Sequence, residues 1–384
     1  MAVKSKKKAA QRQYKVRISS WEEFYCLASW YHNESATWVF RGHEDAAWKL
    51  ESTWDRFVAA YKRDATGKPF KIESSDVNKA LAGYFGFFQG ENTEILRKEN
   101  IMIDEFKRMI CFDHYLGDKT LPYLMMMQHY GIPTRLLDFS YSLFVALYFA
   151  YENTENPERD DEPERAIWAI KLDGIREWLF KNCKTDIENR KMRECNYIEL
   201  ADRLLSDGYK CGVSKGVIPI LYATNPRMVA QKGLFLMSFT KERYTDGFCD
   251  NLQYVLKCNL SALFDKPQAK RWYLKDYIAL RDRSPSDTLD FEEEARKLVK
   301  IEEERGNVTA RNEISLREFL SIKDKSDIHV LKFVFAKDMR TKARVVLEQA
   351  NIDEMSIYPD VGVDVNKLKR ISRNLKYRFK NNLC

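Results

Sequence analysis

The sequence QHYGIPTRLLD, residues 128–138, decides the fold because it places a dense set of polar groups between two strongly apolar segments. The segment before it, 121–127, reads LPYLMMM, and the segment after it, 141–151, reads YSLFVALYFAY. We predict that both are buried helices. The first should end where Gly131 can adopt a left-handed conformation and Pro133 prevents continuation. The polar stretch is therefore predicted to be a connection held between two rigid elements.

This polar connection has two interpretations. Buried polar groups need hydrogen-bond partners, since each group left without one costs about 1–3 kcal/mol. In a structural interpretation, Arg135 and Asp138 form an ion pair that pins the turn, and His129 makes hydrogen bonds in the core. In a functional interpretation, the segment forms one wall of a site, since loops held by a rigid scaffold often carry binding groups. The density of polar side chains favours a site.

Two other motifs carry polar groups at candidate strands. Residues 37–40 are β-prone and are predicted to form a strand that delivers Arg41 and Gly42 at its end. A guanidinium in that place suits bidentate contact with a carboxylate or a phosphate, and the alternative is a structural ion pair. Residues 225–235 read NPRMVAQKGLF, in which Gly233 permits close backbone approach before a strand. Gln231 can bind or orient a ligand but cannot act as an acid or base, because an amide does not titrate.

The remaining pattern predicts an α+β fold, in which a mixed central β-sheet is flanked by helices and carries a helical insertion. Ser20 and Glu23 form a capping box at the start of a helix, and Ser140 is predicted to cap the helix at 141–151. Further strands are predicted at 166–172, 217–223, 234–239, 255–260 and 329–336, and further helices at 92–115 and 342–350. We divide the chain into a flexible basic arm (1–17), the first part of the main domain (18–261), a charged helical insertion (262–327), a closing strand and helix (328–365) and a basic tail (366–384).

The positive charge of the chain is concentrated at its two ends. The 384 residues carry a formal charge of +7, yet residues 1–17 and residues 366–384 each hold seven basic residues and no acid. Removing those charges leaves residues 18–365 at −7. A body that bound nucleic acid along its surface would carry the positive field itself. The ends, rather than the body, are therefore the expected contact for a nucleic acid or an acidic partner.

Several classes of protein lose support from composition. No apolar run reaches the length of about 18 residues that a membrane span needs, and the Lys-rich start lacks the apolar core of a secretory signal. The eight cysteines form no C-x-x-C pair, so we expect reduced thiols, no metal site and a cytoplasmic protein without membrane contact. The glycine-rich phosphate-binding motifs and the G-x-S-x-G motif are also absent.

Together these segments resemble the FRG-domain family, which is named for its Phe-Arg-Gly motif. The resemblance rests on residues 40–42, on the block 128–138 continuing into ALYFA at 146–150, on residues 225–235, and on the closing segment 342–360. It spans about residues 18–365, and the insertion departs from it. The family is mostly bacterial and phage-encoded, and its layout is similar to that of ADP-ribosyltransferase folds.

That resemblance implies an enzyme that uses NAD, of the ADP-ribosyltransferase type, or an NAD-consuming toxin that acts in phage defence. Gln231 and Asp138 would then be catalytic, with Gln231 near the place where such enzymes usually have a glutamate. Arg41 would hold the pyrophosphate or ribose of NAD, and Thr134 would take the position of the hydroxyl-bearing residue. The other residues implied to contact the cofactor are Gly42, Gln128, His129, Tyr130 and Arg135.

One alternative is a non-catalytic module that binds a nucleotide or a nucleic acid. In that case the basic ends supply non-specific affinity, which should fall steeply with salt and vanish when residues 1–17 and 366–384 are removed. A general interaction scaffold, resting on the charged helix near 284–305, is a third hypothesis. The sequence leaves the acceptor substrate and the oligomeric state open.

Overall fold

A computed structural model of the chain contains one mixed sheet of eight strands in the order β5-β6-β3-β2-β4-β8-β1-β7. The pairs β1–β8 and β1–β7 are parallel, and the other neighbouring pairs are antiparallel. This arrangement confirms the predicted α+β class with a mixed central sheet. The structure describes residues 12–56, 93–110, 119–129, 131–152, 163–175, 196–205, 215–221, 226–240, 247–258, 260–263 and 313–359.

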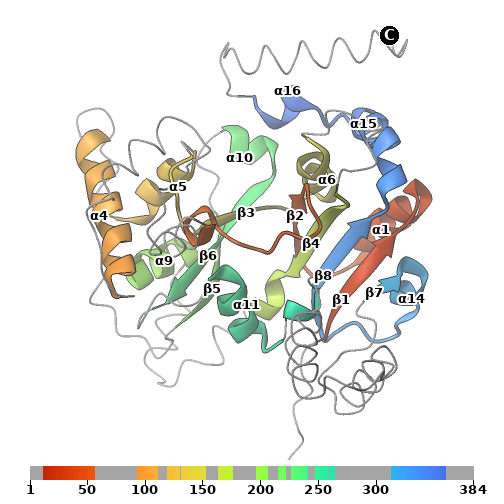
Figure 1. Cartoon of the computed structure of the whole chain (residues 1–384), viewed down its shortest axis with the longest axis horizontal. Helices are drawn as coiled ribbons and strands as arrows, with labels where there is room; N and C mark the ends of the chain where they lie inside the picture. The colour runs from red at the N-terminus through yellow and green to blue at the C-terminus, as the bar shows by residue number, and fades with distance from the viewer. Residues whose placement is uncertain are drawn as a thin grey trace, which may run out of the picture.

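The sheet runs through the middle of the molecule, with α4, α5 and α9 gathered towards its β5–β6 end and α14 beside β7 at the other end (Figure 1). The strands are β1 (Arg12–Ile18), β2 (Trp38–His43), β3 (Leu136–Ser140), β4 (Arg165–Lys171), β5 (Lys215–Ile220), β6 (Gly233–Thr240), β7 (Glu313–Ser315) and β8 (Ile328–Phe335). The helices are α1 (Trp21–Asn33), α4 (Thr93–Ile110), α5 (Leu121–His129), α6 (Leu143–Tyr151), α9 (Tyr197–Leu205), α10 (Pro226–Ala230), α11 (Phe248–Leu256), η1 (Leu260–Leu263), α14 (Leu316–Ser321), η2 (Lys337–Met339), α15 (Arg340–Gln349) and α16 (Glu354–Ile357).

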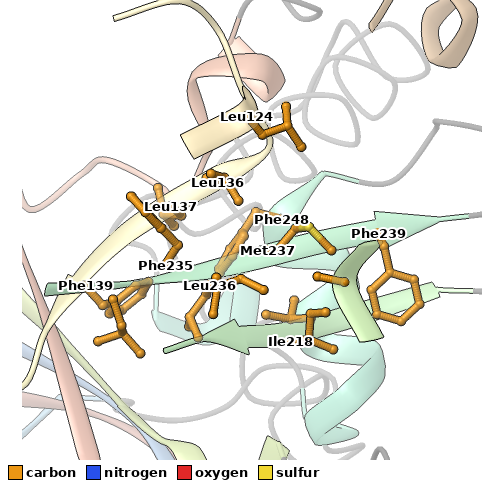
Figure 2. Packing of buried hydrophobic residues seen from close by; sticks show 14 of the residues in the cluster. Leu124, Leu136, Leu137, Phe139, Ile218, Phe235, Leu236, Met237, Phe239 and Phe248 are labelled. Carbon is orange, nitrogen blue, oxygen red and sulfur yellow. The ribbon is translucent and has the colours of Figure 1, made fainter. Parts of the chain in front are cut away.

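Two apolar cores lie on opposite faces of this sheet. Successive side chains of a strand point to opposite faces, and β4 shows the result: Ile167 and Ala169 join one core, whereas Trp168 and Ile170 join the other. The first core contains residues of α1, α6, α14 and α15, and the second contains residues of α5, α9 and α11. Figure 2 shows part of the second core, where side chains of α5, β3, β5, β6 and α11 pack together. A sheet covered on both faces explains why its central strands are apolar in nearly every position.

The N-terminal strand corrects the predicted arm. Residues 12–18 pair with β7 and β8, so the flexible arm predicted at 1–17 is wrong from residue 12 onward. Three basic residues of this strand are engaged within the body. Arg12 donates to the backbone oxygen of Asp324, Lys15 pairs with Glu313 at 2.7 Å, and Arg17 pairs with Glu164 at 2.6 Å. Residues 1–11 and the tail at 366–384 lie outside the described residues.

Four other features of the fold differ from the sequence prediction. Residues 136–140 form a strand, β3, rather than a connection between helices, and Ser142 rather than Ser140 caps α6. The strand predicted at 255–260 is wrong, because Val255 is the penultimate residue of helix α11. Residues 313–321 form β7 and α14 at the sheet edge, so the insertion predicted at 262–327 is wrong from residue 313 onward. Most of the rest of that insertion lies outside the described residues.

Other predictions are confirmed. Helix α5 ends at His129, and Gly131 follows in the left-handed region with a φ of 75°. Ser20 caps α1 by accepting from the backbone N–H of Glu23, whose carboxylate accepts from the backbone N–H of Ser19. Helices α4 and α15 and strands β4, β5, β6 and β8 lie where apolar periodicity placed them. Pro219 is tolerated within β5 because that strand lies at the sheet edge.

Strand β2 and helix α6 approach each other closely at Gly42. A Cβ atom built on Gly42 would lie 1.9 Å from the backbone oxygen of Ala146 and 2.6 Å from the backbone nitrogen of Ala150. Both of these atoms belong to the backbone of α6. Only glycine therefore allows α6 to lie this close to β2.

We predict that Gly42→Ala strongly destabilises the protein, because neither backbone can move away without disturbing a packed core. The expected loss is about 3 kcal/mol or more in the free energy of unfolding, measured by urea denaturation. Gly247→Ala is the matched control, since a Cβ there would meet its nearest atom at 3.5 Å, which is ordinary contact. A Gly42→Ala protein as stable as the Gly247→Ala protein would contradict the close approach of α6.

Candidate functional site

The alternation of strand β2 sends Arg41 to the face of the sheet opposite α6. Phe40 and Gly42 face α6, and Phe40 packs edge-on against the ring of Tyr31 with centroids 4.7 Å apart. Arg41 therefore lies on the other face, with its register partner Trp168. The prediction that Arg41 ends the strand is corrected, because β2 continues to His43. Arg41 and His43 consequently lie on the same face of the strand.

Two neighbours fix the guanidinium of Arg41. Its Nε–H donates to Nε2 of His43 at 3.2 Å, and its Nη1 donates to the backbone oxygen of Asp138 at 2.8 Å. The carboxylate of Asp138 lies 3.8 Å from Nη1. Strands β2 and β3 are paired at Phe40 and Ser140, so the Arg41 side chain bridges the two strands beyond that pair. Among the described residues, no group forms a hydrogen bond or ion pair with Nη2 of Arg41.

A chain of hydrogen bonds continues from Asp138 into the connection after α5. The amide nitrogen of Gln128 donates to Oδ2 of Asp138 at 2.8 Å, and the hydroxyl of Thr134 donates to the amide oxygen of Gln128 at 2.5 Å. Thr134 is fully buried, whereas the Asp138 side chain is 56% exposed. The buried hydroxyl therefore sets the orientation of the Gln128 amide, which presents its N–H groups to an exposed carboxylate.

The helical turn at 53–56 anchors this connection from the other side. The backbone N–H of Thr134 donates to Oγ1 of Thr53 at 2.9 Å. The backbone oxygen of Thr134 accepts from the hydroxyl of Thr53 and from the backbone N–H of Trp54. Burial of Trp54, which is 1% exposed, holds the turn in place. The backbone groups of Thr134 are thus satisfied although it lies between secondary-structure elements.

His43 is buried and neutral at physiological pH. Burial lowers its pKa well below the usual range, and the positive charges of Arg41, Lys332 and Arg56 act in the same direction. Lys332 is itself fully buried on β8, where burial lowers its pKa to about 8. It donates to the backbone oxygens of Ala46 and Leu263.

Arg41 remains charged, although burial lowers its pKa and Arg56 acts in the same direction, while Asp138 raises it. A partly buried guanidinium that keeps its charge needs anionic or dipolar partners. The backbone oxygen and the carboxylate of Asp138 supply them in the free protein.

The structure joins four of the residues predicted to form the site: Arg41, Asp138, Gln128 and Thr134. Gln231 is not joined to this group and has other partners. The backbone oxygen of Gln231 accepts from the hydroxyl of Ser140 at 2.7 Å, and its amide nitrogen donates to the backbone oxygen of Ile357 in α16 at 3.3 Å.

Three further predicted residues also take other places. Gly42 contacts α6, His129 is exposed at the end of α5, and Arg135 points into the protein. Tyr130 lies outside the described residues.

Arg135 and Asp138 do not form the pair considered from the sequence, because each has a different partner. Nε of Arg135 donates to Glu99 of α4 at 2.8 Å, and Nη2 donates to the other carboxylate oxygen. Glu99 is completely buried and Arg135 is 5% exposed. This bidentate pair ties the start of β3 to α4, so it is a structural contact.

Sequence reasoning missed two residues of the site. His43 follows Arg41 by two positions, and strand alternation alone would have placed both on one face. Thr53 had no such signal, because its contact with Thr134 spans 81 residues.

Comparison with known proteins identifies one domain in the chain. A family model, the FRG domain, matches residues 36–159. That interval contains β2, α5, β3 and α6 and all four linked site residues, whereas Gln231 lies outside it. The chain therefore contains an FRG domain at these residues. No curated protein and no solved structure matches it.

Two further properties of the described residues are relevant to the kind of site. Within the part of the chain that the structure describes, no helix is both long and apolar enough to span a membrane. No group of three or more His, Cys, Asp or Glu side chains in those residues is arranged to hold a metal ion.

We predict that Arg135→Met costs about 3–5 kcal/mol of unfolding free energy, because it leaves the carboxylate of Glu99 buried without its cation. Arg203→Met is the control. Its pair with Glu199 on α9 is about 40% exposed and should contribute less than about 1 kcal/mol. Urea denaturation measures both. Equal stability of the two variants would refute the structural role of Arg135 and return it to the set of ligand contacts.

Proposed function

We propose that this FRG-domain protein binds NAD at the Arg41–Asp138 cluster and acts as an ADP-ribosyltransferase-like or NAD-consuming enzyme. The observation that carries the proposal is the fixed orientation of the Arg41 guanidinium, together with its Nη2 group, which is left available for a ligand. Its guanidinium is held in one orientation by His43 and Asp138, while Nη2 has no partner among the described residues. A fixed, partly exposed guanidinium with donors to spare suits a phosphate oxygen of a nucleotide.

Asp138 supplies the second element that this chemistry needs. Its carboxylate is more than half exposed and is oriented by the Gln128 amide, so it can face a substrate while remaining in place. A fixed negative charge stabilises the positive charge that develops on the ribose when the nicotinamide bond breaks. We therefore assign the catalytic role to Asp138 rather than to Gln231, whose neutral amide is engaged by α16.

The proposed reaction is a transfer at the ribose carbon. The bond between that carbon and the nicotinamide nitrogen breaks, and its electron pair leaves with neutral nicotinamide. An acceptor oxygen or nitrogen, or water, forms the new bond to the ribose carbon and releases its proton. Arg41 holds the pyrophosphate, and Asp138 stabilises the ribose cation between these two events.

Trp48 offers a surface for an aromatic ring beside this cluster. Its indole is 50% exposed and lies edge-on to His43, with ring centroids 5.9 Å apart. Stacking on an exposed aromatic side chain is worth about 1–3 kcal/mol for a nucleobase. This supports a ligand that carries both an anion and a flat ring.

In cells, uncontrolled turnover of NAD would make the protein a toxin, which agrees with a role in phage defence. Under this proposal, expression of the wild-type protein in bacteria lowers cellular NAD, and expression of an Arg41 variant does not.

The direct test combines nicotinamide release from NAD with the affinity for ADP-ribose, both measured on purified full-length protein. We expect Arg41→Lys to weaken ADP-ribose binding by tenfold or more, because an ammonium cannot keep contact with His43, Asp138 and a phosphate together. Asp138→Asn should retain binding but lower nicotinamide release by about 100-fold, since it removes only the charge. Arg203→Lys on α9 is the control and should behave as wild type in both measurements.

The outcomes separate the candidate functions. Binding without nicotinamide release from the wild-type protein, across a broad set of acceptors, would leave a nucleotide-binding module in place of an enzyme. Wild-type and Arg41→Lys proteins that both fail to bind ADP-ribose would refute the proposal itself.

A further inference from the structure

The imidazole of His43 contacts the candidate site through Arg41. It is 4% exposed, and its Nε2 accepts the Nε–H of Arg41 at 3.2 Å. The remaining hydrogen bond of Arg41 goes to the backbone of Asp138 through Nη1. His43 therefore fixes Nε of the guanidinium, while Asp138 fixes Nη1, one of its two terminal nitrogens.

This contact requires one protonation state and one tautomer of His43. Nε2 can accept from Arg41 only if it carries no proton, so the proton of the neutral imidazole must lie on Nδ1. The surroundings enforce neutrality, because burial and the charges of Arg41 on β2, Lys332 on β8 and Arg56 on the turn at 53–56 all oppose protonation. The backbone of Trp48 acts in the opposite direction and favours the protonated form. Nδ1 of His43 is buried without a hydrogen-bond partner among the described residues, so the contact of Nε2 with Arg41 alone assigns the tautomer.

The two contacts together determine where Nη2 points. A guanidinium is planar, so fixing Nε and Nη1 fixes the direction of Nη2 as well. With the Nε contact removed, Arg41 could rotate about the single remaining hydrogen bond to Asp138. Its side chain would then follow the Asp138 carboxylate instead of presenting Nη2 to a ligand.

We propose that His43 is a positioning residue for Arg41: as a neutral hydrogen-bond acceptor, it presents the Nη2 group of Arg41 to the phosphate of a nucleotide ligand. This inference rests on the proposed function for the identity of the ligand. The contact with Arg41 is tested separately below. A histidine that merely fills space would be replaceable by any ring of similar size, whereas a positioning histidine needs its acceptor atom.

Two substitutions separate these roles. His43→Phe keeps a ring against Trp48 but has no acceptor, and His43→Gln places an amide oxygen at about the position of Nε2. We expect His43→Phe to weaken the binding of ADP-ribose by at least tenfold and His43→Gln to remain within about threefold of wild type. His32→Gln, on the exposed side of α1, is the control and should bind as wild type. The comparison requires unfolding temperatures of both His43 variants within a few degrees of wild type.

A second measurement detects the contact between His43 and Arg41 in the absence of any ligand. Long-range ¹H–¹⁵N correlation spectra of the imidazoles in the wild-type protein report the tautomer, and His43→Gln identifies the resonances of His43. We expect the Nδ1–H tautomer throughout pH 5.5–8, without titration near pH 6.5.

Three results would overturn the proposal. One is His43→Phe binding as tightly as His43→Gln, and another is the Nε2–H tautomer. The third is a His43 imidazole that titrates near pH 6.5. If no protein binds ADP-ribose, including the wild type, the proposed function fails, and the tautomer measurement alone decides whether His43 positions Arg41. An Nδ1–H tautomer that does not titrate would then support the contact, and the other tautomer would refute it.

Discussion

The arrangement of the site depends on the contact between Gly42 and the backbone of α6. Because a Cβ atom there would lie 1.9 Å from the oxygen of Ala146, helix and strand meet at a separation that only glycine permits. This contact determines which face of β2 is turned towards α6. The residues on either side of Gly42 in the strand, Arg41 and His43, must then face the opposite side of the sheet. Each residue of the Phe-Arg-Gly motif therefore has a different role. Phe40 packs in one core, Gly42 allows the close approach of α6, and Arg41 lies in the candidate site.

The polar groups of the site form a hydrogen-bonded chain, along which the exposure to solvent increases from one end to the other. Thr134 is fully buried and orients Gln128, Gln128 orients Asp138, and Asp138 reaches solvent. Such a chain costs little when every member is satisfied, and it holds its outermost carboxylate in place without covering it. The buried pair of Arg135 and Glu99 ties the segment between α5 and β3 to helix α4. A guanidinium and a carboxylate that face solvent on such rigid support are suited to a charged ligand rather than to stability alone.

Much of the fold could be predicted because continuous apolar runs indicate strands and helices that are buried on both sides, as in β4 and α6. The failures have physical causes. The sequence predicts a flexible arm in place of β1 because the charged residues Lys15 and Arg17 obscure the alternation of apolar positions. The partners of these two residues also lie far away in the sequence. Strand β3 depends on pairing with β6, about 100 residues later, which no local pattern reveals. The same limit applied to the site, since the role of Arg135 was determined by a glutamate 36 residues away.

The proposed function requires Arg41, fixed by His43 and Asp138, to present Nη2 to an anionic group of a nucleotide. A crystal structure of the full-length protein with ADP-ribose tests it most directly. We predict a phosphate oxygen within about 3 Å of Nη2, as expected for a charge-assisted hydrogen bond, with the contact between Arg41 and His43 preserved. A ligand bound elsewhere, or a phosphate that reaches Arg41 only after the contact with His43 is broken, would contradict the account.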